Sequence, residues 1–210
     1  MKKTEKQAAL AELEKLYPDA KPALHFRSAY ELLIAVILSA QCTDERVNIV
    51  TEKLFEKYST PQAMLTLSQA ALEKYIFSCG FYRMKAEHIL SASRDIIERF
   101  GGEVPSTIED LMSLAGVGKK TANVVYSVAF GGAAIAVDTH VFRVSNRLGL
   151  AKGSTPLAVE AGLCKAIPKS DWARAHHWLI YHGRRVCHSR KPNCEQCTLR
   201  ALCDFGKKIK

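Results

Sequence analysis

Apolar residues recur at helical spacing along most of the chain, with polar residues between them. Leu10, Leu13 and Leu16 share one face of a first segment, which Pro18 is predicted to end. The run from Leu32 to Leu38 is apolar on every face, as is typical of a buried helix. The sequence contains no sustained two-residue alternation and no hairpin signal, so the pattern predicts an all-α fold.

Side chains that cap helices mark the predicted starts of most helices. Ser28, Ser68 and Asp138 stand directly before periodic segments, and Thr155 precedes Pro156, which favours the first turn of a helix. Further starts are predicted at two capping boxes and two aspartates: Thr4 with Gln7, Ser106 with Glu109, Asp44, and Asp171.

Two glycine pairs separate helices later in the chain. Gly101-Gly102 is predicted to end a helix that begins at Lys85, and Gly131-Gly132 to end one that begins after Gly118. The segment AAIAV at 133–137 is interpreted as an extended linker rather than a strand. Gly131-Gly132 is also the one domain boundary that composition indicates.

The net charge of +9 favours an anionic partner, and nucleic acid is the first candidate. The segment from Gly183 to Lys210 is the most basic, with eight Lys and Arg against two Asp and Glu. The longest apolar run is too short to span a bilayer, and the N-terminus lacks a secretory signal core. We therefore expect a cytoplasmic protein with no membrane partner.

The stretch LAGVGKKTANVV at 114–125 predicts a tight turn followed by a helix. Gly116 and Gly118 permit positive φ and close approach of the backbone to another molecule. A helix N-terminus carries unpaired N–H groups and partial positive charge, which suits a phosphodiester. Lys119 and Lys120 stand where the helix dipole disfavours cations, unless a phosphate lies nearby. An ordinary turn between helices is the alternative.

One of these lysines could also act in catalysis. The helix N-terminus and the neighbouring cation both disfavour the ammonium form, and a neutral amine can attack a sugar carbon and form a Schiff base. A simple phosphate contact is the alternative role. Chemistry alone does not choose between Lys119 and Lys120.

Asp138 begins the segment DTHVFRV, and an N-cap is its simplest role. A partly desolvated carboxylate beside a lysine nucleophile could also accept a proton or stabilise a developing oxocarbenium ion. For His140, two residues later, a backbone or phosphate contact is preferred over a role as general base.

Four cysteines lie close together near the C-terminus, in the spacing C-x6-C-x2-C-x5-C: Cys187, Cys194, Cys197 and Cys203. In a cytoplasmic protein this crowding favours metal ligation over disulfides. The spacing leaves zinc and a [4Fe–4S] cluster open. The remaining cysteines are scattered and are interpreted as small core residues: Cys42, Cys79 and Cys164.

Together these motifs resemble the endonuclease III family of helix-hairpin-helix DNA glycosylases. The hairpin, VDTHVFRV, HHWLIYHGRRVC and the cysteine spacing carry the resemblance, and ILSAQCTD and CGFYRMKAEHI add to it. The matching motifs run in order from Leu10 to Cys203. The resemblance implies that Lys120 is the Schiff-base nucleophile, that Asp138 is the essential aspartate, and that the four cysteines ligate a [4Fe–4S] cluster.

The resemblance also implies a set of DNA contacts. Lys191 matches a phosphate-contacting residue of the cluster loop, and Gln41 matches a residue that fills the gap left by an extruded nucleotide. Phe81 stands at the position of an intercalating wedge, where the family often has leucine. The implied partner is double-stranded DNA with an oxidised pyrimidine or an abasic site, bound by a monomer.

The architecture implied is two all-α domains with a groove between them. A six-helix domain would span 22–132 and contain the hairpin at about 107–127, while 1–21 and 133–210 would form the cluster domain. Lys120 and Asp138 would face the groove from opposite domains. The implied reaction removes an oxidised pyrimidine and cuts the strand 3′ to the abasic site by β-elimination.

Two alternatives stay open. A monofunctional adenine-mismatch glycosylase shares fold and cluster, but generally lacks a lysine at position 120 and carries a catalytic glutamate in an early helix. Here the corresponding stretch, ILSAQC at 37–42, contains no acid. A non-enzymatic hairpin protein with a structural metal would bind abasic DNA without cutting it.

Overall fold

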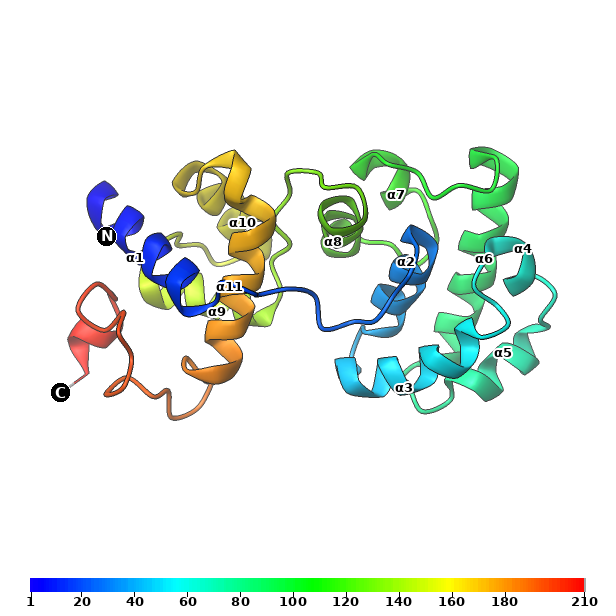
Figure 1. Ribbon diagram of the computed structural model, residues 1–210, viewed down its shortest axis with the longest axis horizontal. Coiled ribbons are helices and arrows are strands. Elements are labelled where there is room, and N and C mark those ends of the chain that lie inside the picture. Colours follow the sequence, from blue (N-terminus) through cyan, green and yellow to red (C-terminus); the bar gives the residue numbers. More distant parts are fainter. Residues whose placement is uncertain (210) are drawn as a thin grey trace. The chain divides into compact units, whose positions relative to one another are not determined.

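The computed structural model describes residues 1–209, and all of its regular structure is helical, which confirms the predicted class. The α-helices are α1 (Lys3–Leu16), α2 (Ala29–Leu38), α3 (Asp44–Phe55), α4 (Pro61–Met64), α5 (Gln69–Ile76), α6 (Tyr82–Phe100), α7 (Ile108–Met112), α8 (Lys119–Ala129), α9 (Thr139–Leu148), α10 (Pro156–Ala166) and α11 (Trp172–Arg185) (Figure 1). Two short 3-10 helices, Lys169–Asp171 and Gly206–Lys208, complete the set. Within residues 1–209, no helix has the length and apolar character that crossing a membrane requires.

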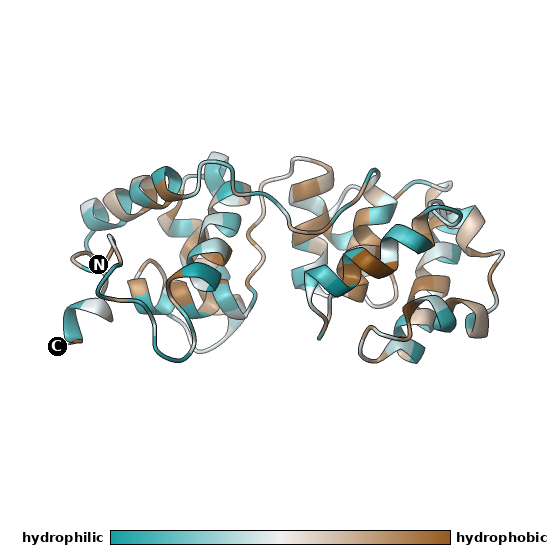
Figure 2. Ribbon diagram, turned by 60° about the horizontal axis from the view of Figure 1, so that its bottom comes forward, coloured by the Kyte–Doolittle hydropathy of each residue, from teal (hydrophilic) through white to brown (hydrophobic). Residues whose placement is uncertain are grey.

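The chain divides into two compact units. Unit 1 combines Met1–Lys21 with the segment from Ala133 onward, and unit 2 is Pro22–Gly132. Each unit has its own hydrophobic core, and hydrophobic and hydrophilic residues alternate along the helices of both units (Figure 2). Unit 1 is therefore discontinuous in sequence.

Helix α2 is the centre of unit 2 and packs against α3, α6 and α8. Every side chain from Tyr30 to Leu38 is buried, and for the run from Leu32 to Leu38 the apolar sequence predicts this. The predicted cap is confirmed, because Ser28 Oγ accepts a hydrogen bond from the Glu31 amide at 3.1 Å. The C-terminal end of α2 is capped by a residue far away in sequence: Lys85 Nζ donates to Leu38 O at 2.7 Å and to Ala40 O at 2.6 Å.

Unit 1 is built around α9 and α11, with α1 packed on α11 and α10 on α9. Ala9, Leu10 and Leu13 bury the apolar face of α1 in this core. The linker at 133–137 forms no strand, and its side chains from Ala134 to Val137 are buried. It leads directly into α9.

Two predicted caps were wrong by one residue. Thr43, not Asp44, caps α3, and Thr107, not Ser106, caps α7. Each threonine hydroxyl accepts a hydrogen bond from the N3 amide, at 3.3 Å and 3.1 Å respectively. Because adjacent residues of both pairs can cap a helix, sequence alone does not distinguish between them. Asp44 instead lies in the first turn, where its charge complements the helix dipole.

Two helices begin earlier than predicted. Helix α1 begins before Thr4, with Lys2 as its cap residue, and Glu5 Oε2 accepts a hydrogen bond from the Lys2 amide at 2.7 Å. Helix α6 begins at Tyr82 rather than Lys85. Its first turn carries no side-chain cap, so the usual sequence signal for a helix start is missing there.

Candidate nucleic-acid interface and metal centre

The hairpin motif lies between α7 and α8 in unit 2, and its apolar residues fix the turn. Leu111, Leu114 and Val117 are buried in the unit 2 core. Successive backbone hydrogen bonds of 3.2 Å join the Leu114 amide to Leu111 O and the Val117 amide to Leu114 O. Buried side chains and backbone hydrogen bonds thus fix the turn, and its polar residues face outward.

The two glycines of the motif differ in backbone conformation and in the space that a Cβ would have. Gly116 has φ +75°, and a Cβ there would lie 2.9 Å from the His88 side chain, so only glycine fits. Gly118 has φ −87°, which any residue adopts, so the prediction of positive φ holds for Gly116 alone. A Cβ at Gly118 would meet nothing within 4 Å. Gly118 therefore leaves open space in front of α8.

Lys119 and Lys120 are the first two residues of α8, and both side chains are exposed. No side chain caps this helix, and its first turn contains no acidic residue. The amide groups of the first turn and both lysines therefore create positive charge at one end of the helix. The geometry is that of an anion site with close access for a backbone phosphate.

Asp138 caps α9, as predicted: its Oδ1 accepts a hydrogen bond from the Val141 amide at 2.7 Å. The side chain is half-buried and follows the buried end of the 133–137 linker. The cap uses one carboxylate oxygen. A second role for this carboxylate is therefore compatible with its structural one.

His140 is half-buried beside Arg143 and Gly183. Its Nδ1 lies 3.1 Å from Arg143 Nη2, and a Cβ on Gly183 would lie 3.0 Å from His140 Cβ. Burial lowers the pKa of His140 below its usual value, with a smaller opposing effect of Asp138. The ring is therefore mainly neutral at pH 7, which suits a hydrogen bond better than a charge-based contact with phosphate.

Three non-glycine residues of the described chain have positive φ: Gln41 (56°), Phe81 (57°) and Lys191 (50°). This left-handed region is unfavourable for residues with a Cβ, by about 1–3 kcal/mol each. The same three residues are the DNA contacts that the family resemblance implies outside the hairpin. Backbone strain and implied function thus coincide at all three positions.

Gln41 and Phe81 lie on neighbouring loops of unit 2. A Cβ on Gly80 would lie 3.3 Å from Gln41 O, so the two loops touch. Both side chains are exposed, and Phe81 retains 64% of its accessible surface. An exposed aromatic in a strained loop has no evident packing role.

The four clustered cysteines line one small pocket in unit 1: Cys187, Cys194, Cys197 and Cys203. Burial raises the pKa of the Cys197 and Cys203 thiols. Within residues 1–209, no three His, Cys, Asp or Glu side chains are close enough to hold a single metal ion. Four thiols around a shared space are a donor set for a metal centre, either zinc or an iron–sulfur cluster.

Two arginines that the sequence did not single out hold the cysteine loop to α9. Arg143 donates to Gly183 O at 3.0 Å and, through Nε, to Cys187 O at 3.1 Å. Arg147 donates to His188 O at 2.6 Å and to Ser189 O at 2.9 Å. Their spacing of four residues places both on one face of α9, but only the fold shows which carbonyls they meet.

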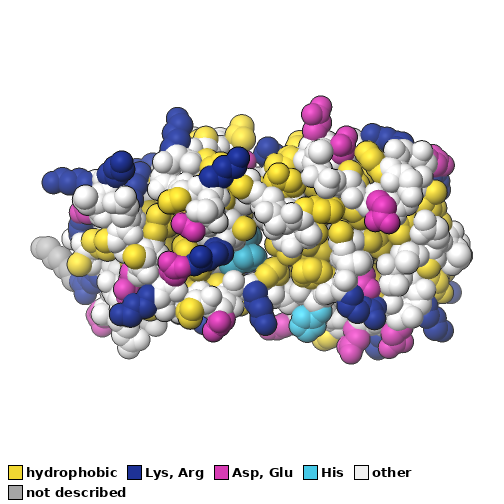
Figure 3. Space-filling model, turned by 45° about the horizontal axis from the view of Figure 1, so that its top comes forward, with side chains coloured by type: hydrophobic (Ala, Val, Ile, Leu, Met, Phe, Trp, Pro, Cys, Tyr) yellow, Lys and Arg dark blue, Asp and Glu magenta, His cyan; other side chains and the backbone are white. Residues whose placement is uncertain are grey.

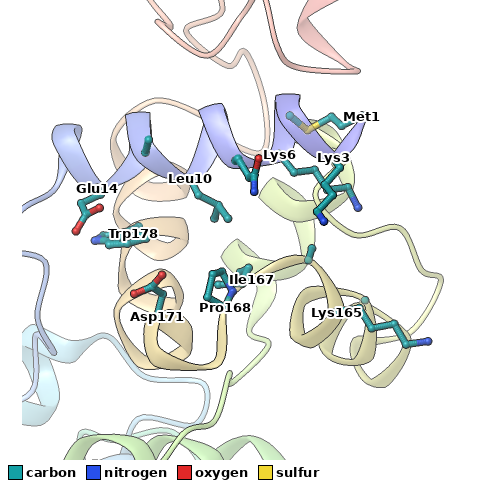
Figure 4. A pocket seen from close by; sticks show the side chains of 14 residues that line it. Met1, Lys3, Lys6, Leu10, Glu14, Lys165, Ile167, Pro168, Asp171 and Trp178 are labelled. Atoms are coloured by element: carbon teal, nitrogen blue, oxygen red, sulfur yellow. The ribbon is translucent and has the colours of Figure 1, made fainter.

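Other surface features do not add to this site. A groove of about 630 Å³ in unit 1 is lined by α1, α10 and α11, with Lys3 and Lys6 near one end and Glu14 near the other (Figure 4). None of the residues predicted for the site lines it. Lysine and arginine side chains are spread over the face in Figure 3, with carboxylates between them, so overall charge does not locate the site.

Comparisons with known proteins agree with the motifs. A family model described as HhH-GPD superfamily base excision DNA repair protein matches residues 34–169. Endonuclease III of Haemophilus influenzae is 48% identical over 209 residues, covering 100% of this chain and 99% of the relative. Endonuclease III of Escherichia coli K12 is 45% identical with the same coverage.

Solved structures give the same result. The structure of a trapped covalent intermediate of endonuclease III with DNA is 49% identical, has a TM-score of 0.95, and covers 99% of this chain and 98% of that chain. The chain therefore belongs to the endonuclease III family of bifunctional DNA glycosylases and AP lyases, within the HhH-GPD superfamily of base excision DNA repair proteins.

Proposed function

We propose that this protein removes oxidised pyrimidines from duplex DNA and cuts the strand on the 3′ side of the resulting abasic site. The observation that carries the proposal is the exposed pair Lys119 and Lys120 at the uncapped N-terminus of α8. A related endonuclease III has been trapped as a covalent intermediate with DNA, which supports a covalent mechanism in this chain. The substrate base must leave the stack to reach a protein amine.

Lys120 is the proposed nucleophile. Its neutral amine attacks C1′ of the damaged nucleotide, the C1′–N bond breaks, and the base leaves with a proton. The sugar ring opens to give an imine between Lys120 and C1′. Loss of a proton from C2′ then expels the 3′ phosphate by β-elimination, and hydrolysis of the imine restores the lysine.

Asp138 is proposed to assist Lys120. Its carboxylate can accept a proton or stabilise the oxocarbenium character that develops at C1′ as the base leaves. The half-buried position of the side chain strengthens such electrostatic effects, because less water surrounds the charge. We infer that Lys120 and Asp138 act on the same sugar.

The proposed DNA contacts divide into two kinds. Lys119, Lys191 and the backbone at Gly116 and Gly118 contact phosphates, which position the duplex without reading its sequence. A neutral His140 would add a hydrogen bond to the backbone.

Gln41 and Phe81 are proposed to occupy the space that the flipped nucleotide leaves. An exposed aromatic side chain can stack on the neighbouring bases, and an amide can pair with the base that has lost its partner. The strained backbone of both loops would then have a function, because it directs the two side chains outward.

The four cysteines are proposed to hold a [4Fe–4S] cluster, and unit 1 is accordingly the cluster domain. The donor set fits, because four thiols share one pocket and the two arginines Arg143 and Arg147 fix the loop that carries Lys191. Such a cluster supplies a rigid four-point link at this loop. The cleavage needs no net electron transfer, so this chain's own residues account for every step.

Unit 2 is proposed to be the helix-hairpin-helix domain, and the protein to act as a monomer. Because the proposed substrate is chromosomal DNA, we expect it to work in the cytoplasm, at the nucleoid.

Borohydride trapping tests the proposal. Wild-type protein and the variants Lys120→Ala and Lys119→Ala are incubated with a duplex that carries one oxidised pyrimidine, then reduced. We expect a covalent adduct with wild type and Lys119→Ala, and none with Lys120→Ala. An adduct with Lys120→Ala would show that another amine forms the imine.

The same experiment separates the alternatives. A monofunctional glycosylase would release the base without an adduct, and a non-enzymatic binder would hold abasic DNA and release nothing. Iron and zinc contents of the purified protein test the cluster. About four iron atoms per chain are expected for a cubane, and stoichiometric zinc would contradict it.

A further inference from the structure

Lys85 is a buried cation of unit 2 that the proposed mechanism does not use. It lies near the N-terminus of α6, and only 3% of its surface is exposed. Burial lowers the pKa of this group, because its charged form loses contact with water. An apolar side chain of similar length would fill the same space without that cost. A buried ammonium at this position therefore needs a specific explanation.

The two acceptors of this ammonium lie at and just beyond the end of α2. Lys85 Nζ donates to Leu38 O at 2.7 Å and to Ala40 O at 2.6 Å, distances typical of strong, charge-assisted hydrogen bonds. The last carbonyls of a helix lack partners within the helix, so the contact with Leu38 is that of a helix cap. Ala40, however, lies outside α2. The second contact therefore fixes the segment that follows the helix.

The Ala40 carbonyl belongs to the peptide group that leads into Gln41. Because a peptide group is planar, a hydrogen bond that holds Ala40 O also fixes the direction of the Gln41 N–Cα bond. Gln41 has φ 56°, and the turn around it is closed by the Cys42 amide, which donates to Ser39 O at 3.1 Å. Such a strained conformation persists only where its surroundings impose it. The contact from Lys85 is one of these constraints.

The backbone of Lys85 is bonded to the second strained loop. Its amide donates to Phe81 O at 3.1 Å, and Phe81 is the cap residue of α6, with φ 57°. The two loops also touch each other, because a Cβ on Gly80 would lie 3.3 Å from Gln41 O. One residue thus contacts the loop of Gln41 through its side chain and the loop of Phe81 through its backbone.

We propose that Lys85 is a positioning residue for DNA binding, which holds Gln41 through Ala40 O in the conformation that enters the gap left by an extruded nucleotide. This inference rests on the proposed function of Gln41. Lys85 itself contacts no DNA, because its ammonium is buried and bonded to carbonyls. A purely structural lysine would instead stabilise unit 2 without a particular effect on Gln41.

The variant Lys85→Met isolates the two hydrogen bonds. Methionine has nearly the length of the lysine stem and is apolar, so it fills the space but donates to neither carbonyl. Without this constraint, Gln41 is free to leave its left-handed conformation. Binding must then order the turn again, and that ordering weakens affinity. Ile96→Ala is the matched control, because Ile96 is fully buried in the same helix, roughly three turns from Lys85.

The first experiment measures the turn without DNA, by hydrogen exchange and mass spectrometry on the full-length, metal-loaded protein. The peptide that contains residues 39–42 should exchange about tenfold faster in Lys85→Met than in wild type, and at the wild-type rate in Ile96→Ala. Equal exchange of this peptide in Lys85→Met and wild type would overturn the proposal. If Lys85→Met does not fold, Lys85→Gln, whose amide nitrogen is one bond nearer the backbone, replaces it with the same expected result.

The second experiment is a double-mutant cycle of Lys85→Met and Gln41→Ala, with affinity measured for a duplex that carries a stable abasic-site analogue. Lys85→Met alone should bind about tenfold more weakly than wild type, and should cause almost no further loss in the Gln41→Ala background. Its affinity for undamaged duplex and the slope of log K against log salt should not change, because no phosphate contact is lost.

The outcomes of the cycle are distinguishable. An equal loss from Lys85→Met in both backgrounds would show a structural role and overturn the proposal. If Gln41→Ala alone costs no affinity for the abasic duplex, the proposed function of Gln41 fails instead. In that case the exchange rate of residues 39–42 still decides whether Lys85 holds the turn.

Discussion

The phenol of Tyr17 lies 3.1 Å from His182 Nδ1, although 165 residues separate the two in the chain. The other ring nitrogen, Nε2, lies 3.7 Å from Cys197 Sγ. His182 is 2% exposed, so these are its partners in a nearly dry environment. As a ligand of the proposed cluster, a Cys197 thiolate would accept and could not donate, which would place the ring proton on Nε2 and leave Nδ1 to accept from the Tyr17 hydroxyl. Helix α1 thereby supports the cysteine pocket.

This relationship predicts that His182 tunes the proposed cluster. An N–H donor to a ligating sulfur stabilises the reduced, more negative state, so His182→Phe should lower the reduction potential of the cluster. His182→Gln keeps an N–H donor and should retain the potential more closely. A redox titration followed by visible absorbance makes the measurement. Identical potentials in all three proteins, at equal iron content, would contradict the prediction.

Asp138 allows its two roles to be separated. Asp138→Asn keeps an oxygen that can accept from the Val141 amide, so the cap should survive while the charge is lost. Base release should fall by about 10²–10⁴, the usual contribution of a general acid–base group. Asp138→Ala should lose activity and also about 0.5–2 kcal/mol of unfolding free energy. Single-turnover rates of base release and urea unfolding measure the two effects. An Asp138→Asn variant with full activity would show that Asp138 acts only as a helix cap.

Strain at Phe81 predicts opposite effects on stability and binding. Phe81→Gly removes a Cβ from the left-handed region and loses little packing, because the side chain is exposed. The free energy of unfolding of this variant, measured by urea titration, should rise by about 0.5–1 kcal/mol. The variant should also bind abasic DNA more weakly. Phe81→Leu should keep the strain and most of the affinity. A destabilised glycine variant would show that the loop is not strained.

The salt dependence of binding tests the phosphate contacts. If about five phosphates are neutralised, log K should fall against log salt with a slope of roughly −4 to −5. Lys191→Asn removes a cation at a left-handed position that asparagine tolerates, and should make the slope less negative by about one. Lys15→Ala, at an exposed position of α1, serves as the charge-matched control. A nearly flat dependence in wild type would contradict DNA binding through phosphates.

Local signals in the sequence predicted most of the helices. The buried helix α2, the cap at Ser28 and the Pro156 start depend on neighbours within one or two turns, and all three were found as predicted. The errors at Asp44 and Ser106 arose where two adjacent residues can cap equally well. Packing of the helix against the rest of the unit decides which of the two residues becomes the cap, and a local sequence pattern carries no information about that packing.

The candidate site was harder to predict, because it depends on contacts between distant segments. Arg143 and Arg147 gain their roles only when α9 meets the carbonyls of the cysteine loop. Positive φ at Gln41 has no local signal either, since glutamine does not favour it.

The discontinuity of unit 1 dictates an order of assembly during synthesis. Residues 22–132 emerge from the ribosome before the returning segment, and domains tend to fold as they emerge. Helix α1 is made first, yet the partners that cover Leu10 and Leu13 are made after unit 2 is complete. The cysteines lie in that returning segment. A nascent chain therefore finishes its hairpin before its cysteines can bind the proposed cluster, so loading of that cluster would be a late step of maturation.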